Sequence, residues 1–319
     1  MSNALYMDWL GAALAQTPAS APADKADLLG PATAGADPAM LGLVAIGVVV
    51  LGVWIIRCFA RPRRLLLLNT PARPNRLNII HIVVVFLAMQ VAMALATEAL
   101  RGVLAEPATA TQPAATAPAG PASEAEPDPR LGQAAGMLAS LTWLAAGLAV
   151  AHVTFRHRLV RGLGLSMRHW MCDSARGVVG YFAILPVCVG LFVLSRSISE
   201  WLGFPLRIHP VLVHFGGQEL GWQIVAAVNA VVLAPLAEEV FFRGLLQSLL
   251  RRVLHGPRAA IVATSIFFAL IHAPAEPQAV PSLFALSLAM GYNYERTGRL
   301  VSPIVIHAIF NAVALLLTT

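Results

Sequence analysis

The chain has 319 residues, of which 58% are hydrophobic and only 12% are charged, and its mean hydropathy is +0.72. A soluble domain carries about 25% charged residues, so this composition predicts a polytopic, all-α membrane protein and excludes an ordinary soluble enzyme. The net charge of +6 does not indicate a nucleic-acid partner, because the basic residues are almost all Arg in short loops between apolar runs. The three cysteines lack the spacing of a zinc ribbon or a disulfide framework.

The apolar runs predict about eight transmembrane helices in five segments. Residues 1–39 and the acidic Pro/Ala linker 106–130 have the composition of disordered chain. Residues 40–105 carry two accessory spans, and residues 131–177 carry a third span followed by a basic loop. Residues 178–319 form the core. The predicted spans are Met40–Ile56, Leu77–Ala96, Leu131–Phe155, Gly177–Leu194, Trp222–Leu254, Ala259–His272, Ser282–Tyr294 and Leu300–Leu317.

The distribution of basic residues predicts the orientation of these spans. If the N-terminus lies outside, 16 of the 22 Lys and Arg residues fall on the cytoplasmic side and five outside, with Arg243 inside a span. Because cytoplasmic loops are enriched in Lys and Arg, the pattern favours both termini outside. The Ala- and Arg-rich composition predicts a bacterial inner-membrane location.

Three polar motifs interrupt the late apolar runs: Glu238 and Glu239 with Arg243, then His272, then His307 with Asn311. Charged groups in lipid cost at least about 2.5–3.5 kcal/mol on insertion scales, so a functional site is expected there. With a rise of 1.5 Å per residue, these groups lie roughly 13–24 Å from the predicted cytoplasmic ends of their helices. They are therefore expected to meet in one layer inside the membrane.

The spacing of the polar residues predicts their chemical roles. Glu239 and Arg243 are i,i+4, the spacing at which a carboxylate and a guanidinium pair on one helix face, so they are expected to be supporting residues. Glu238 then remains as the unpaired carboxylate, which with His272 would activate a water. His307 and Asn311 are also i,i+4, and their N–H groups are donors that an oxyanion hole uses. We predict Glu238, His272, His307 and Asn311 as the catalytic set.

The three motifs, in this order on late membrane helices, resemble the CPBP family of CAAX-protease and bacteriocin-processing (Abi) intramembrane endopeptidases, which includes the type II CAAX prenyl proteases. The resemblance covers about Val178–Leu316. It implies an all-helical membrane fold with the site in a cavity within the bilayer. It also implies that Glu238 and His272 activate water, and that His307 and Asn311 stabilise the transition state.

The expected function is therefore hydrolysis of a peptide bond in a membrane-embedded or lipidated substrate. The residues leave metal dependence open: Glu238, His272 and His307 would ligate a divalent ion such as zinc or act without one, and we favour the metal-free form. Two alternatives remain, a proton-coupled transporter and a non-catalytic scaffold or immunity protein. Neither the substrate nor the oligomeric state can be read from the sequence.

Overall fold

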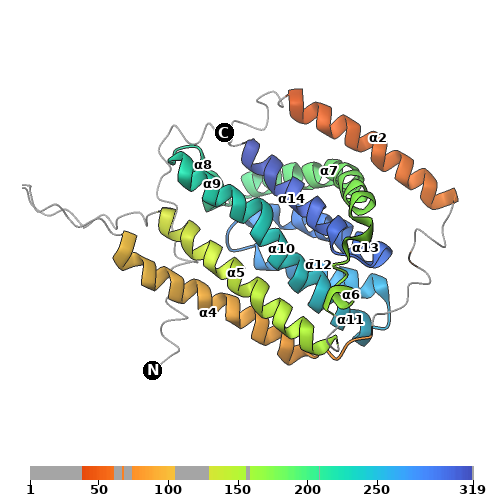
Figure 1. Cartoon of the computed structure of the whole chain (residues 1–319). Coiled ribbons are helices and arrows are strands. Elements are labelled where there is room, and N and C mark those ends of the chain that lie inside the picture. Colours follow the sequence, from red (N-terminus) through yellow and green to blue (C-terminus); the bar gives the residue numbers. More distant parts are fainter. Residues whose placement is uncertain are drawn as a thin grey trace, which may run out of the picture.

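The computed structural model describes residues 38–60, 67, 74–104, 129–155, 159–207 and 209–317, and these residues form helices without a strand (Figure 1). Five consecutive elements make one continuous rod, which we call the central helix: α9 (Leu220–Val228), the π-helix η3 (Asn229–Leu233), α10 (Ala234–Glu239), the π-helix η4 (Val240–Gln247) and α11 (Ser248–Val253). The other long helices are α2 (Pro38–Ala60), α4 (Ile79–Leu104), α5 (Pro129–Thr154), α7 (Trp170–Trp201), α12 (Pro257–Ile271), α13 (Val280–Thr297) and α14 (Val301–Leu316). Short pieces connect them: α6 (Leu159–Leu163), η2 (Met167–His169), α8 (Pro210–Phe215) and η5 (Pro277–Ala279).

Five of the described helices are long and apolar enough to cross a membrane: Pro38–Ala60, Ile79–Arg101, Pro129–Thr154, Met167–Trp201 and Leu220–Val253. α12 and α14 are apolar but shorter. Large apolar side chains are exposed along α2 and α4, as expected for surfaces that face lipid. The predicted all-α, polytopic membrane fold is confirmed, whereas the number of crossings and the side of each terminus stay predictions.

Each of the eight predicted spans is a helix, but some boundaries differ. α7 begins seven residues before the predicted start at Gly177 and continues to Trp201, because Arg196 and Glu200 pair at 2.8 Å across one helical turn and are compatible with the helix. The predicted loop 195–221 also contains α8. The predicted disordered segments 1–39 and 106–130 lie outside the described residues, except for their last two residues, which begin α2 and α5.

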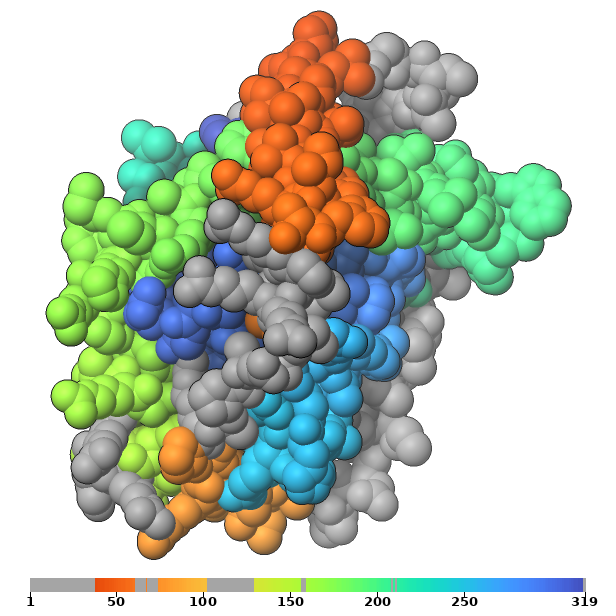
Figure 2. Space-filling model, turned by 90° about the vertical axis from the view of Figure 1, so that its right-hand side faces the viewer, coloured from red at the N-terminus to blue at the C-terminus, as the bar shows by residue number. Residues whose placement is uncertain are grey.

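The central helix lies between two groups of helices. α5 packs against it on one side and α4 packs on α5, whereas α12 and α14 contact it elsewhere. α7 packs against α13, α14 and α2, so α2 and α4 lie at opposite edges of the bundle (Figure 1). Figure 2 shows the face on which α2 lies over the outside of α7. The segment that follows the two adjacent glutamates, η4, is buried along its whole length.

An aromatic cluster fixes the rotation of the central helix. Phe241 and Phe242 are fully buried and their ring centroids are 5.0 Å apart; Trp143 of α5 lies 5.0 Å from the first, and Phe268 of α12 lies 5.0 Å from the second. Such pairs add about 0.5–1.5 kcal/mol each beyond the burial of their area. Because these rings hold η4 between α5 and α12, they determine which way the preceding glutamates point.

Candidate active site

Two π-helical segments flank the glutamate pair on the central helix. Pro235 has no N–H group, and its ring excludes the normal helical hydrogen bond to the carbonyl four residues earlier, which lies in η3. The second π segment, η4, begins directly after Glu239. Single π turns change the direction of side chains and occur frequently at functional sites. The short α10 therefore presents both glutamates toward α12 and α14.

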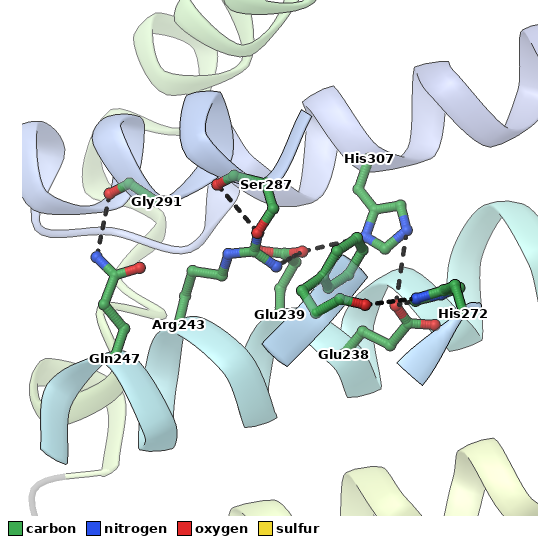
Figure 3. Close-up of polar contacts among 9 residues, drawn as sticks. Glu238, Glu239, Arg243, Gln247, His272, Ser287, Gly291 and His307 are labelled. Atoms are coloured by element: carbon green, nitrogen blue, oxygen red, sulfur yellow. Dashed lines mark hydrogen bonds and ion pairs between the residues drawn. The ribbon is translucent and has the colours of Figure 1, made fainter. Parts of the chain in front are cut away.

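Glu238 faces both predicted catalytic histidines (Figure 3). Its Oε2 lies 4.0 Å from Nε2 of His272 and 3.8 Å from Nε2 of His307. Both distances exceed a direct hydrogen bond and are within the span of a bridging water. Glu238 Oε2 is buried and accepts no hydrogen bond from the described residues. A buried acceptor without a donor is costly, and a bound water would satisfy it.

Glu239, in contrast, is ion-paired through Oε1, although its Oε2 is also buried without a hydrogen-bond partner among the described residues. Its Oε1 accepts a hydrogen bond of 2.7 Å from Arg243 Nη1, and neither side chain is exposed. The second guanidinium nitrogen of Arg243 donates to Ser287 on α13, to Oγ at 2.7 Å and to the carbonyl at 3.3 Å. The i,i+4 pairing expected from the sequence is therefore present. It neutralises two of the three central charges and leaves Glu238 without a basic side chain of its own.

Both histidines present the same ring nitrogen to Glu238. Nδ1 of His307 lies 3.0 Å from Glu239 Oε1, and Nδ1 of His272 lies 2.7 Å from the Phe268 carbonyl. A carbonyl and a paired carboxylate only accept hydrogen bonds, so each Nδ1 carries the proton. In the neutral imidazoles Nε2 is then an acceptor directed at the Glu238 side. When protonated it becomes a donor, so each ring can move a proton at this position.

The Asn311 amide is hydrogen-bonded to the backbone of the central helix, a partner that the sequence did not predict. Its Nδ2 donates to the Ala230 carbonyl at 2.8 Å, a carbonyl within the π segment η3. The amide is therefore oriented by the central helix, one turn beyond His307 on α14. The second N–H of that amide is the group that an oxyanion role would use, and this role stays a prediction.

The fit of a metal ion can be tested on these donors. Zinc accepts nitrogen from His and oxygen from Glu. However, within the part of the chain that the structure describes, no three His, Cys, Asp or Glu side chains are grouped so that they could hold an ion. The structure therefore gives no support for a resident zinc, metal dependence stays a prediction, and no step below is derived through a metal ion.

Two further residues position the site: Phe268, for which the sequence predicted a packing or cavity-wall role, and Ser287, which sequence reasoning missed. Phe268 lies with its ring 4.8 Å from His272 and 5.8 Å from His307, and the Arg243 guanidinium lies 5.0 Å from the same ring. Ser287 was not predicted because a lone Ser in an apolar run carries no motif. One sequence signal existed: Ser287 and Gly291 are spaced i,i+4 on α13, the same spacing as Arg243 and Gln247 on the central helix. In the structure, Gln247 donates to the Gly291 carbonyl at 3.1 Å (Figure 3).

A second missed feature is the turn after α12. His272 is the C-cap residue of α12, and the loop before α8 is bonded to the following turn through Arg207, which donates to the Pro274 carbonyl at 3.1 Å. His209, the N-cap residue of α8, lies close enough to His272 to respond to its charge. Burial, and to a smaller extent the charge on His272, lower the pKa of His209. The α7–α8 loop thus borders the His272 side of the site.

Comparison with known proteins supports the resemblance seen in the motifs. Residues 220–313 match the family model described as "Type II CAAX prenyl endopeptidase Rce1-like". No curated protein and no solved structure matches the chain. The matched residues extend from the start of the central helix into α14 and contain all six predicted site residues. Residues 220–313 therefore carry an Rce1-like segment of the CPBP/CAAX protease family, within a polytopic membrane protein.

Proposed function

We propose that this chain is an intramembrane endopeptidase that hydrolyses a peptide bond of a membrane-embedded or lipidated substrate. The observation that carries the proposal is the geometry of Glu238. Its Oε2 is buried without a hydrogen-bond partner among the described residues, and it lies 3.8–4.0 Å from two imidazole nitrogens. A water between these groups would donate hydrogen bonds to Glu238 and to one Nε2, which is the arrangement that general-base catalysis requires.

The proposed reaction begins with attack of that water on the carbonyl carbon of the scissile bond. Glu238, supported by His272, takes the proton as the C–O bond forms. The developing oxyanion accepts hydrogen bonds from Asn311 and from the protonated form of His307, whose Nδ1–H is held by Glu239. The C–N bond then breaks, and the same proton is returned to the leaving amine. Glu239, Arg243 and Ser287 position His307 and do not contact the reacting atoms.

We propose a metal-free mechanism, because Glu238 and the two Nε2 atoms are sufficient to accept a proton from water. The predicted bacterial inner-membrane location, the N-out and C-out orientation and the segment boundaries outside residues 220–313 also stay proposals. The family description names a CAAX prenyl endopeptidase, and lipidated peptides are accordingly the first substrate class to test.

The test is a comparison of membrane peptides from cells that produce the wild type, Glu238→Gln or Glu219→Gln. Glu219 is an exposed glutamate at the start of the same central helix, and its side chain makes no capping hydrogen bond, so it is a matched control. Peptides that accumulate uncleaved only with Glu238→Gln are the expected substrates. Identical peptide profiles for all three, with any cellular phenotype retained, would instead favour the scaffold or transporter alternative.

A further inference from the structure

A wedge-shaped groove opens between α2 and α7, away from the active site. The two helices cross closely at Gly47, where an added Cβ would lie 2.6 Å from the Phe182 carbonyl oxygen and 2.7 Å from the Pro186 ring. Only a residue without a side chain allows this approach. From the crossing toward the C-terminal end of α2, the helices diverge and α13 forms the floor between them.

The diverging helices enclose a cavity of about 770 Å³. This volume lies within the range of about 300–1,000 Å³ that is typical of ligand sites. Its walls are mostly aliphatic: Val49, Val50 and Val53 of α2, Val179 and Ile184 of α7, and Leu288 of α13. The cavity therefore offers an apolar slot that is open to the side of the bundle, where lipid would surround the protein.

Three arginines line the wide end of the slot. Arg57 lies in the last turn of α2, Arg176 in the second turn of α7 and Arg296 in the last turn of α13. All three are exposed. Asp173 pairs with Arg176 at 2.7 Å, but it also accepts two hydrogen bonds from Arg299, so it is shared between two cations. Among the described residues, no carboxylate pairs with Arg57 or Arg296.

Aromatic residues mark the level at which the slot becomes polar. Trp54 and Tyr292 line the cavity one turn before Arg57 and Arg296, and their rings meet edge to face with centroids 5.8 Å apart. The Arg296 guanidinium donates to the Tyr292 hydroxyl at 3.2 Å. Trp and Tyr are enriched at the depth of lipid headgroups, and basic pockets between membrane helices bind anionic headgroups.

We propose that this groove is a binding site for an anionic glycerophospholipid of the surrounding bilayer. One acyl chain would lie in the slot between α2, α7 and α13, and the phosphate would be bound by Arg57, Arg176 and Arg296. The positive charge of these three arginines favours an anionic over a zwitterionic headgroup. The lipid would fill the space that the divergence of α2 leaves and hold that helix on the core.

The groove is separate from the proposed catalytic centre and does not depend on the proposed function. α13 divides the two: Ser287 and Gly291 face the central helix, where they meet Arg243 and Gln247. The cavity is lined by Leu288, Ala289 and Tyr292 on another side of α13. A bound lipid would therefore not compete with a peptide at Glu238.

The experiment measures lipid binding to the purified full-length protein by native mass spectrometry. The two probes are phosphatidylglycerol and phosphatidylcholine with identical acyl chains. We expect phosphatidylglycerol to bind more tightly to the wild type. At about 1 kcal/mol per basic residue near a headgroup, Arg57→Gln with Arg296→Gln should weaken phosphatidylglycerol binding about 30-fold. Phosphatidylcholine binding should weaken less, because its choline cation offsets the charge of the phosphate. Ala289→Phe should fill the slot and weaken both lipids.

Matched controls separate the site from general effects. Arg101→Gln removes an exposed arginine of α4, and Ala94→Phe adds a ring at an exposed position of α4, so neither should change lipid binding. If Ala289→Phe fails to elute as a folded species in gel filtration, the double arginine variant, which changes only exposed side chains, decides the question.

Three results would overturn the proposal. The first is equal binding of the two lipids to the wild type. The second is unchanged phosphatidylglycerol binding in the double arginine variant. The third is displacement of phosphatidylglycerol from the wild type by a geranylgeranylated peptide, together with loss of peptide binding in Ala289→Phe. The occupant of the groove would then be a lipidated peptide.

Discussion

The buried ion pair between Glu239 and Arg243 makes a prediction about stability. Arg243→Met removes the 2.7 Å bond to Glu239 and both bonds to Ser287, while the carboxylate stays fully enclosed. Breaking a buried pair by removing one partner costs about 3–5 kcal/mol, because an uncompensated charge remains. We expect the free energy of unfolding in detergent to fall by that amount. Since the two helices α13 and α14 are both attached to this pair, through Ser287 and His307, the loss should affect the whole site.

A double-mutant cycle separates the charge from the packing. Glu239→Gln removes the carboxylate, and Glu239→Gln with Arg243→Met should be less destabilised than the sum of the two single variants, by about 0.5–3 kcal/mol. Arg101→Met is the control, because Arg101 pairs with Glu98 at 3.3 Å with both side chains exposed, and such pairs contribute about 0–1 kcal/mol. If Arg243→Met cost no more than this control, the account of a buried pair that holds His307 would be refuted.

Two further predictions concern residues near the site. Gly291→Ala should lower the free energy of unfolding by about 1–3 kcal/mol, because the new Cβ would lie 2.8 Å from Gln247 Oε1 and 3.1 Å from a methyl of Ile261. A free energy of unfolding equal to that of the wild type would contradict this packing. Burial raises the pKa of Glu276 from 4.5 to about 7, so its contribution to stability is complete below pH 4.5 and is lost as the pH rises through 7. Relative to Glu276→Gln, the free energy of unfolding of the wild type should therefore fall by about 1–2 kcal/mol between pH 4.5 and 8, since the side chain is only partly buried. If the free energies of unfolding of the two proteins changed in parallel with pH, this prediction would be contradicted.

The sequence predicted the helices and the meeting of three motifs because both depend on strong local signals. Long apolar runs identify membrane helices, and the i,i+4 spacing of Glu239 and Arg243 brings them together on any regular helix. The helical rise of 1.5 Å per residue was enough to predict that Glu238, His272 and His307 lie in one layer inside the membrane. The structure brings both histidine side chains within 4.0 Å of Glu238, and the catalytic roles of the three residues stay predictions.

The parts that the sequence could not predict depend on departures from regular geometry and on tertiary contacts. The π turns around Pro235 change the direction of the side chains that follow, and no periodic pattern reports them. As a result, the Asn311 amide meets the Ala230 carbonyl, although its spacing from His307 gave no indication of that partner. The Ser287 contact and the crossing at Gly47 each require the position of a second helix, which spacing within one helix does not contain.

The most direct test of the account is the hydrolysis rate of the purified protein, reconstituted in lipid, on a peptide identified by the cellular comparison. A general base contributes about 10²–10⁴-fold, so Glu238→Gln should lower kcat/KM by at least about 100-fold. Glu219→Gln should match the wild type, and a zinc chelator should leave the wild-type rate unchanged. A Glu238→Gln variant that hydrolyses the peptide at the wild-type rate would contradict the central claim that Glu238 activates the attacking water.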